Sequence, residues 1–189
     1  MIRVTLDRKA NFRMKTISVH EFQSPVGALL IGCYQHELVL CDWKYRKQRV
    51  LIDKRIQQGL EADFIEEIVP LHAEVMEQLK EYFKGERKTF DVPIRFVGSD
   101  FQQKVWRSLC EIPYGSTKSY AALSECLGNL KAIRAVASAN GANAISILVP
   151  CHRVVGSSGE LTGYAGGLPA KKKLLQIENS LHSAQLEMF

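Results

Sequence analysis

Several features that would place this 189-residue chain in a specialised class are missing from it. No apolar run approaches the roughly 20 residues that a membrane-spanning helix needs. The basic N-terminal stretch, residues 1–15, has no apolar core of the kind found in secretory signals. We therefore expect no membrane partner and a location inside the cell, in the cytoplasm of a bacterium or in the nucleus of a eukaryote.

Closely spaced cysteines are missing as well. The five cysteines are an odd number, and no two of them are separated by only two residues. A disulfide framework needs pairs, and a clustered zinc site needs closely spaced ligands, so we expect neither. His20, Cys33, His36 and Cys41 could act as scattered ligands, but half-buried strand residues explain them more simply. We expect no metal and no cofactor.

The composition that remains is that of a globular protein. Hydrophobic residues make up 46% of the chain and charged residues 24%, which argues against intrinsic disorder. The length suffices for one substantial domain or for two small ones that share an interface. The net charge of +5 is compatible with a polyanionic partner but does not establish one.

The N-terminal third has the pattern of an antiparallel meander. Short turn sequences separate three runs rich in apolar and β-branched residues, at 15–22, 27–34 and 37–43. Such runs with such spacers predict consecutive strands. The basic stretch that follows, residues 44–50, is most simply a solvated strand end or loop.

A helix and a domain boundary are predicted next. From Leu71 to Phe83 apolar residues recur every fourth position, which is typical of a helix, and Gly85 is a plausible C-terminal stop. A segment rich in proline, glycine and charge follows. We therefore expect an N-terminal domain at 1–95 and a second domain at 96–189.

The second domain is expected to be mainly helical. Ser99 or Asp100 can cap a helix, with Gln102 at the capping-box offset from Ser99. Further on, a short helix from Tyr120 to Cys126 is followed by a glycine turn and another helix at 131–139. This is the sequence pattern of a helix-turn-helix, although many other helical domains contain such a pair.

The faces of the second of these helices differ in character. Its inward face is predicted to consist of Ile133, Val136, Ala137 and Asn140. Its outward face carries two cations and two small residues, which are Lys131, Arg134, Ala135 and Ser138. Small side chains with cations suit close approach to the phosphates and groove of a nucleic acid. An ordinary amphipathic helix with a solvated face explains the pattern equally well.

A possible nucleophile lies in the stretch "ISILVPCHRVVG". Pro150 ends a run expected to be buried, and Cys151 and His152 follow it. A reactive cysteine needs a base or a field that favours its thiolate, and His152 could supply one. Since neighbours in sequence often point apart, a water molecule would have to connect them. The alternative is that Cys151 is an inert core residue.

The last helix offers a third member for this site. Glu178 falls at the edge of an apolar stripe, where a carboxylate is costly unless it is paired. If its partner is His152, the result is a Cys–His–Glu chain in which Glu178 orients the imidazole. Alternatively, Glu178 reaches solvent. The glycine-rich segment around Tyr164 could form the wall of a pocket for a planar ligand, or it could be only a flexible turn.

Taken together, these motifs resemble the O6-alkylguanine-DNA alkyltransferases. The resemblance rests on "PCHRVVGSSG", "TGYAGG" and "KKKLLQIE", and upstream on "FQQKVW", "IPYGSTKSY" and "RAV". It covers about residues 101–178, and the "SPVG" turn fits the less specific N-terminal part. The implied fold is α+β: an N-terminal antiparallel sheet with a helix, ribonuclease H-like, followed by a mainly helical, winged helix-turn-helix-like domain.

The resemblance implies a single-use DNA repair reaction. The protein would be a monomer that binds double-stranded DNA containing O6-alkylguanine through the minor groove and flips the damaged base out of the stack. Cys151 would accept the alkyl group, with His152 as the base acting through water and Glu178 behind it. Tyr120 would contact the guanine and assist its departure. O4-alkylthymine is a further possible substrate.

Other roles implied by the resemblance concern binding. Arg134 would fill the gap left in the stack, Asn143 would brace the turn near the site, and Tyr164 would stack on the lesion. The backbone carbonyls of Cys151 and Val154 would accept from the guanine amino group, and the amide of Ala165 would lie by O6. Ser157 and Gly166 would line the same pocket. On the outward helix face, Ala135, Ser138 and Lys131 are expected to contact DNA. Arg153 is expected to brace the segment through a salt bridge.

The chain departs from the family pattern at a few positions. Leu130 and Ile133 change the start and inner face of the recognition helix, and Ala144 stands where proline is frequent. These differences bear on affinity and substrate range rather than on the reaction. Two other classes remain as alternatives: a helix-turn-helix regulator or lesion-binding protein without alkyl transfer, and a cysteine hydrolase built on the same three residues.

Overall fold

A computed structural model of the chain describes residues 15–179. Its N-terminal part contains the predicted meander, with strands β1 (Lys15–Ser24), β2 (Gly27–Tyr34) and β3 (Glu37–Trp43) paired antiparallel. The two residues between β2 and β3, Gln35 and His36, both have positive φ, at 48° and 65°. Positive φ at both positions is the geometry of the tight turn that matches the twist of a hairpin.

A fourth strand and a helix were not predicted from the sequence. Strand β4 (Ala62–Glu66) pairs with β1 in parallel, so the sheet has the order β3-β2-β1-β4 and is mixed rather than purely antiparallel. The connection to β4 is helix α1 (Arg49–Leu60). The end of the basic stretch at 44–50, interpreted as a loop or strand end, is therefore the first turn of α1.

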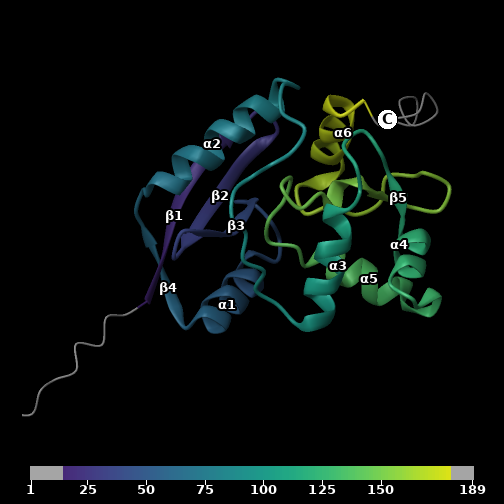
Figure 1. Ribbon diagram of the computed structural model, residues 1–189, viewed down its shortest axis with the longest axis horizontal. Helices are drawn as coiled ribbons and strands as arrows, with labels where there is room; N and C mark the ends of the chain where they lie inside the picture. Colours follow the sequence, from purple (N-terminus) through teal and green to yellow (C-terminus); the bar gives the residue numbers. More distant parts are fainter. Residues whose placement is uncertain (1–14, 180–189) are drawn as a thin grey trace, which may run out of the picture.

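The two faces of the sheet are covered differently. Helix α2 (Pro70–Phe83) packs on one face, with Leu71, Val75 and Leu79 buried, and ends just before Gly85, which has φ of 77°. This confirms the predicted helix and its stop. The helical half of the chain lies beside the sheet (Figure 1), and the same face shares a hydrophobic cluster with it. Helix α1 lies on the opposite face.

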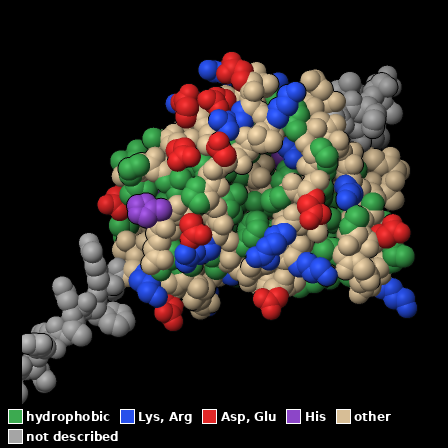
Figure 2. All heavy atoms as spheres, viewed as in Figure 1, with side chains coloured by type: hydrophobic (Ala, Val, Ile, Leu, Met, Phe, Trp, Pro, Cys, Tyr) green, Lys and Arg blue, Asp and Glu red, His purple; other side chains and the backbone are tan. Residues whose placement is uncertain are grey.

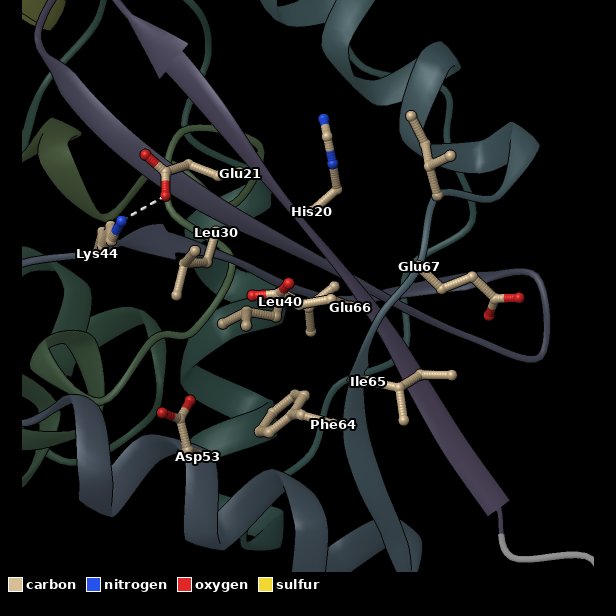
Figure 3. A pocket seen from close by; sticks show the side chains of 12 residues that line it. His20, Glu21, Leu30, Leu40, Lys44, Asp53, Phe64, Ile65, Glu66 and Glu67 are labelled. Carbon is tan, nitrogen blue, oxygen red and sulfur yellow. Dashed lines mark hydrogen bonds and ion pairs between the residues drawn. The ribbon is translucent and has the colours of Figure 1, made fainter.

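Part of that opposite face is left open by α1 (Figure 3). It holds a pocket of about 730 Å³. Apolar and acidic side chains line it together, among them Leu30, Leu40, Phe64, Glu21, Asp53 and Glu66. Glu21 is paired there with Lys44 at 2.5 Å.

The helical half begins with helix α3 (Asp100–Cys110). The predicted capping box is confirmed: Ser99 Oγ accepts from the amide of Gln102 at 3.3 Å, and Gln102 Oε1 accepts from the amide of Ser99 at 3.0 Å. Helix α4 (Tyr120–Cys126), a 3₁₀ turn (Leu130–Ala132) and helix α5 (Ile133–Gly141) form the predicted helix pair. The last helix is α6 (Gly167–Ile177).

Two short segments complete this half. Cys151–Arg153 form a 3₁₀ turn, and strand β6 (Val154–Val155) pairs in parallel with strand β5 (Lys118–Ser119). No helix within residues 15–179 is long and apolar enough to cross a membrane. The division at 95/96 stays a prediction.

The predicted inward face of α5 is partly wrong. Val136 and Asn140 are buried and Ala137 is half-buried, but Ile133 is 40% exposed. Ile133 lies in the first turn of α5, beyond the packed core, where it lines an open pocket with Tyr120. The apolar contact that completes the inward face is made by Ala139 instead.

Candidate active site

The turn before Cys151 is held by one asparagine. Asn143 donates from Nδ2 to the carbonyl oxygen of Val149 at 2.9 Å and to Sγ of Cys151 at 3.2 Å, while its Oδ1 accepts from the amide of Ile145 at 2.9 Å. The run 145–149 is buried throughout, as expected. Ile147 has a φ of 74°, so the turn is bent sharply at that position. Asn143 therefore fixes the path of the backbone and the position of the sulfur together.

Burial dominates the acidity of the thiol. Cys151 is 4% exposed, and burial raises the pKa of its thiol, an effect that the hydrogen bond from Asn143 opposes. A thiol with a raised pKa is protonated at neutral pH, so it needs a base at the moment of reaction. Within residues 15–179, no hydrogen bond connects Sγ directly to the ring of His152.

His152 is completely buried and faces Glu178. Its Nε2 lies 2.7 Å from Oε1 of Glu178. Burial lowers the pKa of His152, an effect that the hydrogen bond and charge of Glu178 oppose. A carboxylate only accepts, so Nε2 carries the proton and Nδ1 is left as an acceptor. Among the described residues, Nδ1 has no hydrogen-bond partner.

Glu178 is the centre of a buried polar network. Besides His152, it accepts from the hydroxyl of Tyr82 at 2.7 Å and from Nε of Arg153 at 2.8 Å. Burial alone would raise the pKa of the Glu178 carboxyl, but the hydrogen bonds and charges of His152 and Arg153 outweigh it and lower the pKa to about 2. The carboxylate is therefore ionised over the whole physiological range of pH.

Sequence reasoning missed two members of the site. Tyr82 was treated only as part of a helix, although a phenol in the buried stripe of α2 needs a polar partner. Lys171, on α6, is fully buried and donates from Nζ to the carbonyl oxygens of Val154 at 2.6 Å and Thr162 at 2.8 Å. Burial lowers the pKa of Lys171 to about 8. A lysine in a basic run gives no sign of such burial.

Of the predicted pocket residues, Tyr120, Ser157, Tyr164, Ala165 and Gly166 line two neighbouring hollows, whereas Val154 lines neither. Tyr120, Ile133, Ser157 and Thr162 line one of about 570 Å³, and Tyr164, Ala165, Gly166 and residues 45–48 line another of about 510 Å³. Gly141 and Gly163 border both. At Gly166 a Cβ would collide with the indole ring of Trp43, so the chain needs glycine there.

Two tyrosines lie close to the thiol and its base. The Tyr120 hydroxyl accepts from Nδ2 of Asn140 at 3.3 Å, and its pKa is raised by burial and by Cys151. The ring of Tyr164 lies edge-on to that of His152, with centroids 6.4 Å apart. The carbonyl oxygen of Val154, expected to receive a guanine amino group, already accepts from Lys171 and has one lone pair left.

The outward face of α5 lies apart from these hollows. Of its four predicted residues, Arg134, Ala135 and Ser138 lie on α5 and Lys131 lies in the 3₁₀ turn before it; all four are exposed. On the face of the molecule shown in Figure 2, Lys and Arg side chains are interspersed with Asp and Glu.

Within residues 15–179, no group of three His, Cys, Asp or Glu side chains could hold a metal ion.

The fold and the site together define a class of protein. In this class a mixed sheet is joined to a helical half, and the helical half buries a cysteine next to a His–Glu pair. The ribonuclease-like domain of 6-O-methylguanine DNA methyltransferase matches residues 17–96, and the DNA binding domain of the same family matches residues 100–180. The chain is 41% identical over 158 residues to a methylated-DNA–protein-cysteine methyltransferase of Methanosarcina barkeri, covering 84% of this chain and 94% of that one.

Solved structures agree with these sequence matches. The crystal structure of Mycobacterium tuberculosis OGT in complex with DNA superposes with a TM-score of 0.73 at 37% identity, covering 89% of this chain and 97% of that one. The corresponding methyltransferase sequence from that organism is 51% identical over 114 residues, covering 60% of this chain and 69% of that one. The chain belongs to the 6-O-methylguanine DNA methyltransferase family.

Proposed function

We propose that this protein repairs DNA by moving the alkyl group of O6-alkylguanine onto Sγ of its own Cys151. The observation that carries the proposal is the unused Nδ1 of His152, a buried imidazole whose other nitrogen is held by Glu178 at 2.7 Å. A base of this kind beside a buried thiol is the arrangement that activates a cysteine for nucleophilic attack. A regulator that only binds DNA has no use for it.

Recognition begins at the outward face of α5. Lys131, in the turn before the helix, neutralises a phosphate, while the small Ala135 and Ser138 let the helix approach the floor of the minor groove. The O6 substituent lies inside the base stack, so the nucleotide must be flipped out before a sulfur can reach it. Arg134, exposed at the start of α5, is long enough to fill the gap that the base leaves.

The flipped base is received by the walls of the two hollows. Tyr164 stacks on its face, and the amide of Ala165 lies by O6. The free lone pair of the Val154 carbonyl accepts from the guanine amino group, while Ser157 and Gly166 line the sides. Lys171 holds the carbonyls of Val154 and Thr162 in place, so these two segments keep a fixed separation.

The transfer is a single displacement. The Cys151 proton passes through a water molecule to Nδ1 of His152, and the Glu178 carboxylate stabilises the resulting imidazolium. Sγ attacks the alkyl carbon, an S–C bond forms, and the bond from that carbon to O6 breaks. The Tyr120 hydroxyl gives its proton to the departing guanine, which leaves uncharged, and the imidazolium proton restores the phenol.

The product is a stable thioether, so each molecule acts once. An alkyl thioether lacks the carbonyl carbon that water attacks in the acyl-enzyme of a cysteine hydrolase, so a water molecule activated by His152 does not regenerate the thiol. We infer that the protein acts as a monomer, in the cytoplasm where it meets chromosomal DNA. Repair of O4-alkylthymine would use the same sulfur and the same base.

Intact mass tests this proposal. The protein is incubated with a duplex containing O6-methylguanine, and the mass of one methyl group is expected to be added. Cys151→Ala must abolish the addition, whereas Cys110→Ala, which removes an exposed cysteine, must leave it unchanged. Addition to the Cys151→Ala variant would contradict the assignment of the acceptor.

A further inference from the structure

A buried ion pair in the N-terminal half lies at the edge of the site, where Arg46 also lines one of the two hollows. Asp42, on β3, is fully buried, and Arg46, just after β3, is 6% exposed. Nη1 of Arg46 lies 2.6 Å from Oδ2 of Asp42. Burying two charges is costly, and a buried pair is by itself weak evidence of a stabilising role. The other contacts of these two side chains show what they hold.

Both members reach across to one turn of the helical half, residues 141–146. Arg46 donates from Nη1 to the carbonyl oxygen of Asn143 at 2.7 Å, and from Nη2 to that of Gly141. Asp42 accepts from the hydroxyl of Ser146 at 3.1 Å. The backbone of β3 adds two more bonds, because Cys41 donates to Ala144 at 2.9 Å and accepts from Ser146 at 2.6 Å. The turn 141–146 is therefore held along its length.

This turn connects the DNA-facing helix to the sulfur. It begins at Gly141, the last residue of α5, and it contains Asn143, whose side chain donates to Sγ of Cys151 at 3.2 Å. The carbonyls that Arg46 binds lie at the C-terminal end of α5, where the helix dipole favours a cation. A displacement of the turn would thus move α5 and Asn143 together.

We propose that Arg46, paired with Asp42, is a positioning residue for alkyl transfer that acts through Asn143. It makes no hydrogen bond to Cys151 or to His152, although it also lines one of the two hollows. It holds the backbone carbonyl of Asn143. The side-chain amide of Asn143 therefore stays hydrogen-bonded to Sγ of Cys151 while α5 binds DNA and the base is flipped out. This role rests on the proposed function of Cys151. It means that the N-terminal half contributes a residue that positions the reacting sulfur.

Arg49 offers a matched control. It also pairs with Asp42, at 3.2 Å from Nη1, but its other described partner is Asp53, and it makes no hydrogen bond to the turn 141–146. Arg49→Met therefore removes a cation from Asp42 without releasing the turn. Arg46→Met releases the turn while Arg49 remains beside the carboxylate.

Single-turnover kinetics separate positioning from stability. Well below the melting temperature, Arg46→Met should slow transfer by roughly 10-fold to 100-fold, since a misplacement of about 1 Å costs that much. Arg46→Lys should recover part of the rate, and Arg49→Met should leave it close to that of the wild type. The double variant Asn143→Ala/Arg46→Met should transfer the alkyl group no more slowly than Asn143→Ala alone, because Arg46 acts only through Asn143.

A second variant covers the case in which Arg46→Met fails to fold. Asp42→Asn with Arg46→Met removes both charges, so no ion is left unpaired, and the turn is still released. Slow transfer by this folded variant supports the role, whereas transfer at the wild-type rate overturns it. Additive effects of Arg46→Met and Asn143→Ala would also overturn it.

Failure of the repair assignment itself would look different. If the wild-type protein takes up no methyl group, the proposed function is wrong, and the positioning role is then tested on alkylation of Cys151 by iodoacetamide without DNA. Arg46→Met should change that rate in the same direction as Asn143→Ala, and the double variant should change it no further. An iodoacetamide rate unaffected by Arg46→Met would overturn the role.

Discussion

His152 and Glu178, 26 positions apart in the chain, meet through a 2.7 Å contact between Nε2 and Oε1 in the buried interior of the protein. The contact fixes the tautomer of His152, and with it the side of the ring that can receive a proton. Because Glu178 is held in turn by Tyr82 and Arg153, the orientation of the imidazole is set by both halves of the chain.

Replacing the carboxylate tests its role in activating His152. With Glu178→Gln, we expect transfer to slow by roughly 100-fold or more, because a positioned general base contributes about 10²–10⁴ in rate. The variant should also be destabilised by about 3–5 kcal/mol, since Arg153 is left without its buried partner. Rates come from single-turnover assays and stability from denaturant unfolding.

Tyr82→Phe is the matched control for that change. It removes one hydrogen bond to the charged Glu178 and leaves the charge in place, so we expect a loss of about 1.5–3 kcal/mol in stability and a transfer rate close to that of the wild type. Equal losses of transfer rate in the two variants would contradict a specific role of the Glu178 charge in activating His152.

The lowered pKa of Glu178 predicts that the folded protein loses stability in acid. The pKa of this carboxyl is lowered from 4.5 to about 2 in the folded protein. A carboxyl whose pKa is lower in the folded than in the unfolded protein stabilises the fold at pH values above its unfolded pKa. That stabilisation is lost as the pH falls from about 4.5 towards about 2. Melting temperatures measured across this window should fall more steeply for the wild type than for Glu178→Gln. Parallel curves would contradict the assignment.

Arg134 is expected to matter only when a base has to be flipped. With Arg134→Ala, repair of O6-methylguanine in duplex DNA should weaken, since nothing fills the gap in the stack. Reaction of Cys151 with the free base O6-methylguanine should be affected much less. Both rates are measured on the same protein preparation. An equal loss of rate with the duplex and with the free base would rule out the role of Arg134 in base flipping.

Tyr120 should act on the chemical step. With Tyr120→Phe, guanine has to leave without a proton donor, so single-turnover transfer should slow by roughly 100-fold. Affinity for duplex DNA, measured by fluorescence anisotropy, should stay near that of the wild type. A loss of affinity that accounts for the whole effect would place Tyr120 in binding instead.

Local patterns in the sequence were sufficient for much of the fold. The strands of the meander, helix α2 and the capping box at Ser99 all depend on neighbours a few positions apart, and all were predicted. Strand β4 pairs with a strand more than 40 positions earlier in the chain, and α1 buries only Ile52, Ile56 and Leu60. The short strand β4 leaves no clear periodic signal. The apolar residues of α1 do recur every fourth position, and this signal was missed behind the basic stretch that precedes it.

The site shows the same division between local and distant information. Motif residues such as Cys151 could be found because they lie within a few short segments. Arg46 and Lys171 could not, because each stands in a basic run that resembles a solvated surface. Their burial is decided by partners elsewhere in the chain: Asp42 and the carbonyls of the turn 141–146 for Arg46, and the carbonyls of Val154 and Thr162 for Lys171.

The central claim is that Cys151 accepts one alkyl group and is not regenerated. The most direct test is a titration in which a large excess of duplex DNA containing O6-methylguanine is incubated with a known amount of protein, and repaired guanine is counted until the reaction stops. We predict one guanine repaired per protein molecule, with S-methylcysteine at position 151 by peptide mass spectrometry. Continued repair beyond that ratio, or a methyl group on any other residue, would contradict the account.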